Sequence, residues 1–355
     1  MKISYIVNVD LNDKQARAVQ VYSNALMFHK YLKDDFSCVC IGKDNNIFKN
    51  IWVNNIKIES SKTRKLLFHI QSIKYILETD VVYSRNLSIL WLASLFGKKI
   101  VWEMHDGISG ANLKFFNKLF KKLKIVAISD GLNKYLINEY NFNKDNILIA
   151  HDGVFLENYD ELRKTDKSIL RKDLNLLENR TIVMHTGSLY KGRGAELFEV
   201  IIKNFPELYF VQVGGNTENI IAWKEYYREY NNILFIGHQN NDNLIKYQMS
   251  ADLLFLPMTK NSPIWWCTSP MKVFEYMATS IPILGSNVGS VGEVISKRNS
   301  IIFNPEDEQT IIGGVKYFLA NKEEAEKLAN HALEDIENKY RWDLRVENII
   351  RFIKK

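Results

Sequence analysis

Short apolar runs of strand length alternate with helical patterns along the whole chain, and this alternation constrains the fold more than any other feature. In the first half, helical patterns cover residues 16–32, 63–77 and 130–140. The predicted strands around them are residues 3–7, 37–41, 81–83, 99–102, 125–128 and 147–150. Strands that alternate with helices pair in parallel, and the helices cover the sheet. The sequence therefore predicts an α/β fold with doubly wound parallel sheets.

A second alternating set begins after a polar stretch at residues 157–167, which is typical of a linker. Its predicted strands are residues 181–185, 209–213, 233–236, 253–257, 281–284 and 301–303. A chain of 355 residues is long for one domain and suits two. Doubly wound sheets bind ligands at the carboxyl ends of their strands, so we expect a ligand site in a cleft between two Rossmann-like domains.

Composition excludes several classes of protein. Apolar residues make up 46% and charged residues 25%, which is ordinary for a globular chain. The three cysteines cannot form an even disulfide set and show no metal-ligand spacing, as expected in a reducing cytosol. The chain enters a short strand directly, without a signal-peptide pattern, and no run approaches a membrane-spanning length. A cytoplasmic location is therefore expected.

Residues 114–124 concentrate basic charge within a net charge of only +6. Five lysines alternate there with Phe115, Phe116, Leu119, Phe120 and Leu123 at spacings that predict a basic amphipathic helix. One interpretation is a surface for anionic lipid headgroups at the inner face of the cell membrane. The other is a helix that packs its apolar face on its own domain and leaves the lysines solvated. Nucleic acid is not expected as a partner, because no recognition module accompanies these lysines.

Residues 269–278 contain the most specific chemical signal. Ser269 and Pro270 predict a helix start, with the serine as cap and the proline at the first helical position. Lys272 lies in the first turn, where the helix dipole disfavours a cation unless an anion is bound there. Glu275, three residues later, shares its face and suits the hydroxyls of a ribose. The pair predicts a nucleotide site; the alternative is an amphipathic helix with a chance charge pair.

Residues 185–194 predict a strand, a glycine-rich turn and a helix start. The glycines let the backbone approach an anion, while Lys191 and Arg193 supply positive charge. The pattern matches neither the dinucleotide fingerprint nor the phosphate-binding loop of nucleotide hydrolases. Alone it also fits a tight turn with solvated basic side chains. Together with Lys272 and Glu275 it predicts a second wall of one pyrophosphate site.

Titratable residues also follow two strands of the first half. Glu103, His105 and Asp106 follow one strand directly, and Arg85 follows another, so all four are candidates for the ligand site. The alternative is a turn in which Asp106 caps a helix and His105 satisfies local backbone groups. In the second half, the turn containing His238 offers backbone groups to a base.

These motifs, in this order, resemble the retaining nucleotide-sugar glycosyltransferases of family 4, which have the GT-B fold. The resemblance runs along nearly the whole chain, from residues 82–85 and 103–106 through 127–132 and 152–154 to 187–194, 251–257, 269–278 and 341–343. It implies an acceptor-binding N-terminal domain at 1–156, a nucleotide-sugar-binding domain at 157–337, and a last helix at 338–355 that crosses back to the N-terminal domain.

The resemblance also implies residue roles. Arg193 and Lys272 would neutralise the donor diphosphate, with Lys191 as a helper, Glu275 would hold the ribose, and His105 would face the donor sugar. His105, Arg193 and Lys272 are thus the catalytic candidates. The remaining donor-binding candidates are Gly187, Ser188, His238, Ser269, Met271 and Val273. No metal and no cofactor are expected, because basic side chains and a helix N-terminus would stabilise the leaving diphosphate.

The chain departs from the family pattern just before this helix. The family often has a pair of glutamates here; Glu275 matches the second, but Cys267 stands in the first position, after Trp265 and Trp266. A thiol cannot replace a carboxylate as a hydrogen-bond acceptor for sugar hydroxyls. We therefore expect backbone groups of residues 267–269 and an indole wall to contact the donor sugar, with Arg85, Glu103 and Asp106 as further sugar or acceptor candidates.

The expected function is transfer of a sugar, with retention, from a UDP- or GDP-linked donor to a hydroxyl of a glycan or lipid-linked acceptor. Bacterial surface polysaccharide, such as lipopolysaccharide or capsule, is the expected product. Two alternatives remain open at this point: a nucleotide-sugar 2-epimerase on the same fold, and a nucleotide-sugar-binding protein without catalytic activity.

Overall fold

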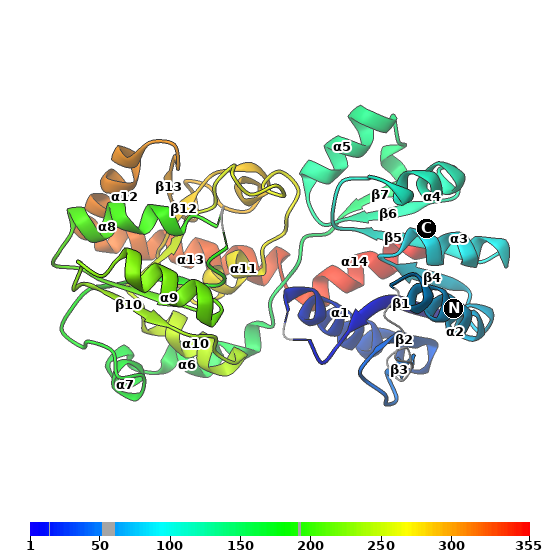
Figure 1. The fold of residues 1–355 in the computed structure, drawn as a ribbon, viewed down its shortest axis with the longest axis horizontal. Coiled ribbons are helices and arrows are strands. Elements are labelled where there is room, and N and C mark those ends of the chain that lie inside the picture. Colours follow the sequence, from blue (N-terminus) through cyan, green and yellow to red (C-terminus); the bar gives the residue numbers. More distant parts are fainter. Residues whose placement is uncertain (14, 52–60, 191–192) are drawn as a thin grey trace. The chain divides into compact units, whose positions relative to one another are not determined.

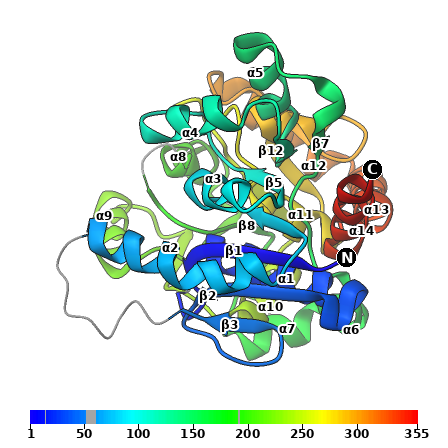
Figure 2. The same cartoon turned by 90° about the vertical axis from the view of Figure 1, so that its right-hand side faces the viewer.

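Two parallel β-sheets organise the chain, one in each of two units (Figure 1). The computed structural model describes residues 1–13, 15–51, 61–190 and 193–355. The first unit comprises Met1–Asp152 and Trp342–Lys355, and the second comprises Gly153–Arg341. Both ends of the chain therefore lie in the first unit (Figure 2).

The first unit has a seven-stranded sheet in the order β3-β2-β1-β4-β5-β6-β7, with every pair parallel. Its strands are β1 (Ile3–Asp10), β2 (Phe36–Ile41), β3 (Phe48–Asn50), β4 (Val81–Ser84), β5 (Lys99–Met104), β6 (Lys124–Ala127) and β7 (Ile147–Ile149). Its helices are α1 (Ala16–Leu32), α2 (Ser61–Leu77), α3 (Leu87–Leu95), α4 (Ala111–Leu119), α5 (Asp130–Tyr140) and α14 (Trp342–Lys354).

Both faces of this sheet are covered, as a parallel sheet requires. Tyr5 and Ile6 are neighbours on β1 and point to opposite faces, yet both are fully buried. On one face, α1 and α14 pack against each other and share a hydrophobic cluster with the strands. The C-terminal helix is thus part of the core of the first unit.

The second unit has a six-stranded parallel sheet in the order β10-β9-β8-β11-β12-β13. Its strands are β8 (Ile182–Thr186), β9 (Tyr209–Val213), β10 (Ile233–Ile236), β11 (Leu253–Leu256), β12 (Ile283–Ser286) and β13 (Ile301–Phe303). Its helices are α6 (Asp160–Lys164), α7 (Lys167–Asp173), α8 (Phe198–Asn204), α9 (Thr217–Tyr226), α10 (Asn241–Ser250), α11 (Met271–Ala278), α12 (Glu308–Ala320) and α13 (Lys322–Lys339). The predicted fold class, with two Rossmann-like parallel-sheet domains, is confirmed.

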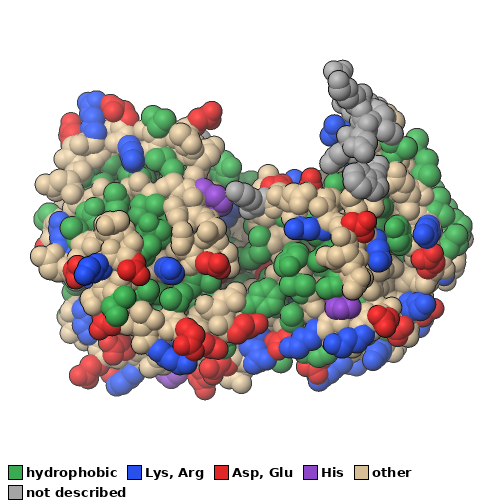
Figure 3. Space-filling model, turned by 90° about the horizontal axis from the view of Figure 1, so that it is seen from below, with side chains coloured by type: hydrophobic (Ala, Val, Ile, Leu, Met, Phe, Trp, Pro, Cys, Tyr) green, Lys and Arg blue, Asp and Glu red, His purple; other side chains and the backbone are tan. Residues whose placement is uncertain are grey.

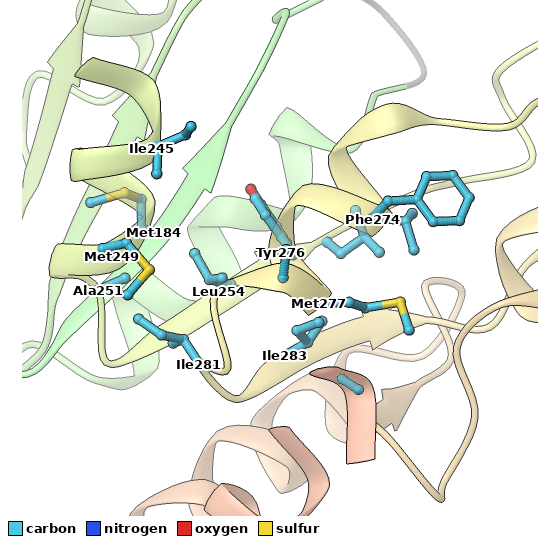
Figure 4. Packing of buried hydrophobic residues seen from close by; sticks show 14 of the residues in the cluster. Met184, Ile245, Met249, Ala251, Leu254, Phe274, Tyr276, Met277, Ile281 and Ile283 are labelled. Atoms are coloured by element: carbon cyan, nitrogen blue, oxygen red, sulfur yellow. The ribbon is translucent and has the colours of Figure 1, made fainter. Parts of the chain in front are cut away.

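Helix α11 is anchored in the second core along most of its length. Tyr276 and Met277 point toward the strands near Leu254 and Ile283 (Figure 4). The Tyr276 hydroxyl accepts a hydrogen bond from the backbone N–H of Thr186 at 2.7 Å, which ties the helix to the end of β8. Helix α11 and the loop after β8 are therefore held together at the carboxyl edge of the sheet.

The predicted basic helix at 114–124 is wrong at its C-terminal end. Helix α4 stops at Leu119, a turn follows, and Lys124 is already the first residue of β6. Lys124 donates a hydrogen bond to the Phe352 carbonyl at 3.0 Å, so it serves the fold of this unit. Phe116 and Leu119 are buried, and the Phe116 ring contacts Trp102 and Phe142, so the apolar face of α4 packs on its own unit.

None of the helices in the described part of the chain is long and apolar enough to cross a membrane. On the face shown in Figure 3, basic and acidic side chains are interspersed.

Candidate functional site

The carboxyl edge of the second sheet carries the predicted donor-binding residues. Gly187 directly follows β8, has φ of +129°, and donates its backbone N–H to the Val213 carbonyl at 2.8 Å. A Cβ atom built on Gly187 would lie 2.6 Å from Lys272 Nζ. The glycine therefore provides both the backbone conformation and the space that let the lysine lie against the turn.

Lys272 lies in the first turn of α11 and is partly buried. Its Nζ is 2.8 Å from Nε2 of His185, a fully buried residue of β8. Burial, followed by the nearby Arg193 guanidinium, lowers the pKa of Lys272 to about 7, although Glu275 opposes that change. A lysine in this state gains a proton readily when an anion binds beside it.

His185 is neutral in this arrangement. Its Nδ1 lies 2.5 Å from Gln212 Oε1, and the Gln212 amide nitrogen donates to the Gly187 carbonyl at 3.0 Å. Burial and the neighbouring Lys272 hold the pKa of His185 well below its usual value. The imidazole therefore donates from Nδ1 and accepts from Lys272 at Nε2.

Glu275 lies one turn along the helix from Lys272 and is also partly buried. Its Oε2 accepts a hydrogen bond from Gln248 Nε2 at 3.1 Å. Burial raises the pKa of Glu275, while Gln248 and Lys272 act in the opposite direction. The carboxylate is thus fixed by α10 and remains beside the lysine, as the shared helix face predicted.

Arg193 is positioned by the turn before Gly194. A Cβ atom on Gly194 would lie 1.8 Å from the Pro257 carbonyl oxygen, so only glycine lets the loop pass this close to the backbone after β11. Within the described residues, the Arg193 guanidinium makes no hydrogen bond and no ion pair. Burial lowers the pKa of Arg193 from its usual value. Lys191 lies outside the described residues, so its predicted role stays a prediction.

The predicted start of α11 is wrong by one residue. The helix begins at Met271, and Pro270 is its N-cap residue with an extended ψ of 115° and no capping side-chain hydrogen bond. Pro270 thus precedes the first turn instead of forming its first position. Val273 is fully buried in the core, so only its backbone can face a donor. Ser269 is buried, Ser188 and Met271 are partly buried, and His238 is exposed in the loop after β10.

The Cys267 side chain is not available to a sugar. It is only 1% exposed, and its Sγ points to the Ile264 carbonyl at 3.7 Å. The preceding turn is fixed because the Trp265 carbonyl accepts the Ser290 N–H at 3.2 Å. Trp265 and Trp266 are both partly buried. The predicted sugar contact through the backbone of residues 267–269 and the indoles stays a prediction.

In the first unit, Glu103 is the centre of a buried ionic network. Oε1 accepts from Arg345 Nη2 at 2.8 Å, and Oε2 accepts from Arg85 Nε at 2.8 Å and from the Tyr5 hydroxyl at 2.5 Å. Burial alone would raise the pKa of Glu103, but Arg85 and Arg345 outweigh it and hold that pKa well below its usual range. The Glu103 side chain has no exposed surface, so it is not placed to make the predicted contact with a sugar or an acceptor. Glu103 instead holds the side chains of Arg85 and Arg345 in place.

His105 lies at the edge of this network. Its side chain is 18% exposed, and Nε2 is 3.6 Å from Glu103 Oε2. Burial, followed by Arg85, lowers the pKa of His105, so the imidazole is neutral near pH 7. Asp106 is exposed, and it does not cap a helix, because α4 begins after Gly110. His105 therefore remains a candidate contact to a ligand.

Sequence reasoning missed four residues of these two clusters: His185, Gln212, Gln248 and Arg345. A signal existed for two of them, because His185 and Gln212 are polar residues within otherwise apolar strands, and the strand register places them side by side. Gln248 and Arg345 lie on helices and carry no such local signal.

A cavity of about 380 Å³ lies elsewhere in the first unit, at the amino ends of β1 and β2. Lysines and acidic residues line it together, and none of the predicted site residues does. Its mixed charge favours no ligand class.

The comparisons with known proteins relate the chain to glycosyltransferases. Residues 166–335 match the family described as Glycosyl transferases group 1. The "Uncharacterized glycosyltransferase MJ1607" of Methanocaldococcus jannaschii is 23% identical over 237 residues, covering 63% of this chain and 58% of that protein. The "Putative teichuronic acid biosynthesis glycosyltransferase TuaC" of Bacillus subtilis is 23% identical over 234 residues, covering 65% of this chain and 55% of that protein. The chain thus spans little more than half the length of these curated relatives.

Solved structures show the same fold over the full chain. The Anabaena Alr3699/HepE protein in complex with UDP superimposes with a TM-score of 0.78 at 15% identity, covering 100% of both chains. WaaG, a glycosyltransferase involved in lipopolysaccharide biosynthesis, gives a TM-score of 0.70 at 14% identity, covering 98% of each chain. Residues 166–335 therefore match the glycosyl transferases group 1 family, in a chain with the GT-B fold.

Proposed function

We propose that this chain is a retaining glycosyltransferase that moves a sugar from a UDP- or GDP-linked donor to a hydroxyl of a glycan or lipid-linked acceptor. The observation that carries this proposal is the cation pair at the carboxyl edge of the second sheet. Lys272 lies near Arg193, whose guanidinium adds to burial in lowering the pKa of Lys272, while burial lowers the pKa of Arg193. The similarity to proteins named as glycosyltransferases, and to a protein solved with UDP, supports a donor diphosphate as that anion.

The chemistry follows from where charge develops. When the sugar leaves, negative charge grows on the terminal phosphate oxygen of the nucleoside diphosphate. In this proposal, the Lys272 ammonium, the Arg193 guanidinium and the N-terminus of α11 would stabilise that charge without a metal ion. Glu275 would bind the ribose hydroxyls, and the turn at His238 would lie along the base. Retention would follow if the departing phosphate oxygen takes the acceptor proton on the same face of the sugar.

His105 would contact the donor sugar in this proposal. A neutral imidazole with a partly exposed edge donates or accepts a hydrogen bond to a sugar hydroxyl without introducing charge near the reacting carbon. The acceptor would belong to bacterial surface polysaccharide synthesis, in line with the names of TuaC and WaaG. We place the reaction in the cytoplasm, at the inner face of the membrane.

Release of nucleoside diphosphate tests the proposal. The protein is incubated with UDP- and GDP-sugars, first alone and then with an extract of lipid-linked glycans, with and without a metal chelator. We expect slow donor hydrolysis alone, faster release with acceptor, no effect of the chelator, and a product that keeps the anomeric configuration of the donor by NMR. Tight donor binding without turnover of any donor would instead show a non-catalytic binding protein.

A further inference from the structure

The side chains of Gln212, His185 and Lys272 form a hydrogen-bonded row from the interior of the sheet to the proposed donor site. The register of β8 and β9 places His185 opposite Gln212, and both are fully buried. The Gln212 amide nitrogen donates to the Gly187 carbonyl at 3.0 Å, which directs its oxygen toward His185 Nδ1 at 2.5 Å. Since an amide oxygen only accepts, Nδ1 carries the imidazole proton.

The tautomer of His185 determines whether its other ring nitrogen, Nε2, donates or accepts a hydrogen bond. With Nδ1 protonated, Nε2 has a free lone pair and accepts a hydrogen bond from Lys272 Nζ at 2.8 Å. This bond holds the ammonium over Gly187, where a Cβ atom would lie 2.6 Å from Nζ. A lysine stem has four rotatable bonds, and fixing it before a ligand arrives removes an entropic cost from binding.

We propose that His185 and Gln212 are positioning residues of the donor site, which hold the Lys272 ammonium over Gly187 so that it is in place for the donor diphosphate. His185 is 1% exposed, so it acts through Lys272 and does not touch the donor. This inference rests on the proposed function, because it assumes that Lys272 binds a donor phosphate.

The charges around Lys272 support this role. His185 faces it from β8, Arg193 from the loop after β8, and Glu275 from its own helix. Burial keeps His185 neutral, and a neutral imidazole attracts the ammonium, whereas an imidazolium would repel it and could not accept its hydrogen. Because the pKa of Lys272 is about 7 in the free protein, donor affinity should fall as the pH rises above 7.

Isothermal titration calorimetry with UDP-glucose and GDP-mannose as probes, from pH 6 to 9, tests the inference. For the probe that binds the wild type, we expect Lys272→Met to weaken binding by on the order of 10- to 100-fold and to abolish its pH dependence. His185→Phe should weaken binding by about tenfold, because the lysine loses its acceptor. His185→Gln should restore most of the affinity, since an amide oxygen can accept from the ammonium.

The outcomes separate the two proposals. Wild-type affinity in a folded His185→Phe protein, together with weak binding by Lys272→Met, would overturn the positioning role alone. Unchanged affinity in Lys272→Met, or no binding of either probe to the wild type, would overturn the proposed donor site and this inference with it. If His185→Phe does not fold, Gln212→Met replaces it; this variant keeps the side-chain length but removes the oxygen that fixes the tautomer. Wild-type affinity in that variant would equally contradict the role.

Discussion

Lys272 and Glu103 are charged residues with opposite surroundings, and this contrast separates the ligand site from the structural network. Glu103 is enclosed by Arg85 and Arg345, so its charge is compensated within the fold. Lys272 instead faces a neutral imidazole and a second cation, and Glu275 is the one anionic group among the described residues that raises its pKa. A cation pair without full compensation is costly unless an anion joins it. At the scale of single residues, this incompletely compensated charge of the second unit is what supports the proposed donor site.

The Glu103 network should make stability depend on pH. The pKa of Glu103 is lower in the folded than in the unfolded state, so its contribution is fully present above the unfolded value of about 4.3 and is lost as the pH falls below it. Glu103→Gln should lower the free energy of unfolding at pH 7 by about 3–5 kcal/mol, because two buried guanidinium groups lose the carboxylate that they share. The variant's free energy of unfolding should also fall less than that of the wild type as the pH decreases, as measured by urea unfolding between pH 3 and 8.

Glu347→Gln is the matched control, since Glu347 pairs with Arg351 on the exposed side of α14. Exposed pairs contribute only about 0–1 kcal/mol, so this variant should behave as the wild type. Equal stability of Glu103→Gln and Glu347→Gln across the pH range would show that the network does not stabilise the fold.

At the scale of elements, the apolar face of helix α4 packs in the core, whereas its lysines lie at the surface. Phe116 is buried, whereas the lysines on α4 and in the turn after it are exposed. These exposed lysines are Lys114, Lys118, Lys121 and Lys122. The apolar face thus serves the core, and the charge alone remains for a partner.

We predict that this basic surface binds anionic membranes. The wild type should cosediment with vesicles that contain phosphatidylglycerol but not with pure phosphatidylcholine vesicles. Lys→Gln changes at positions 114, 118, 121 and 122 should abolish binding, since each lysine contributes about 1 kcal/mol at an anionic surface. The control exchanges four exposed lysines of the second unit, at positions 203, 224, 297 and 316. Equal binding by both variants would exclude α4 as the membrane contact.

Much of the element pattern was predictable, because the local sequence determines it. Strand β9, strand β10 and helix α1 have the predicted bounds, since apolar periodicity defines each of them. Strand β3 was missed: its three residues, Phe48–Asn50, are too short and polar for a periodic signal. The site was predictable where two residues share a helix face, as Lys272 and Glu275 do. Arg345 was not, because its contact with Glu103 joins residues 242 positions apart.

At the scale of the whole molecule, the chain leaves the first unit after Asp152 and returns to it at Trp342. Val154 and Arg341 form a parallel bridge, so the outgoing and returning segments run side by side within the second unit. The returning helix α14 then brings Arg345 to Glu103 in the first unit. The returning segment thus completes a buried network of the first unit. The family match at 166–335 lies within the second unit.

The central claim is that the second unit binds a nucleoside diphosphate sugar through α11 and the turn after β8. The dissociation constant of the best-binding nucleotide sugar, measured by calorimetry for Glu275→Ala, tests it most directly. We expect this variant to bind on the order of 10- to 100-fold more weakly than the wild type, because the ribose loses a charged acceptor. Glu306→Ala, which removes an exposed carboxylate paired with Lys260, should leave binding unchanged. A dissociation constant for Glu275→Ala equal to that of the wild type would contradict the account.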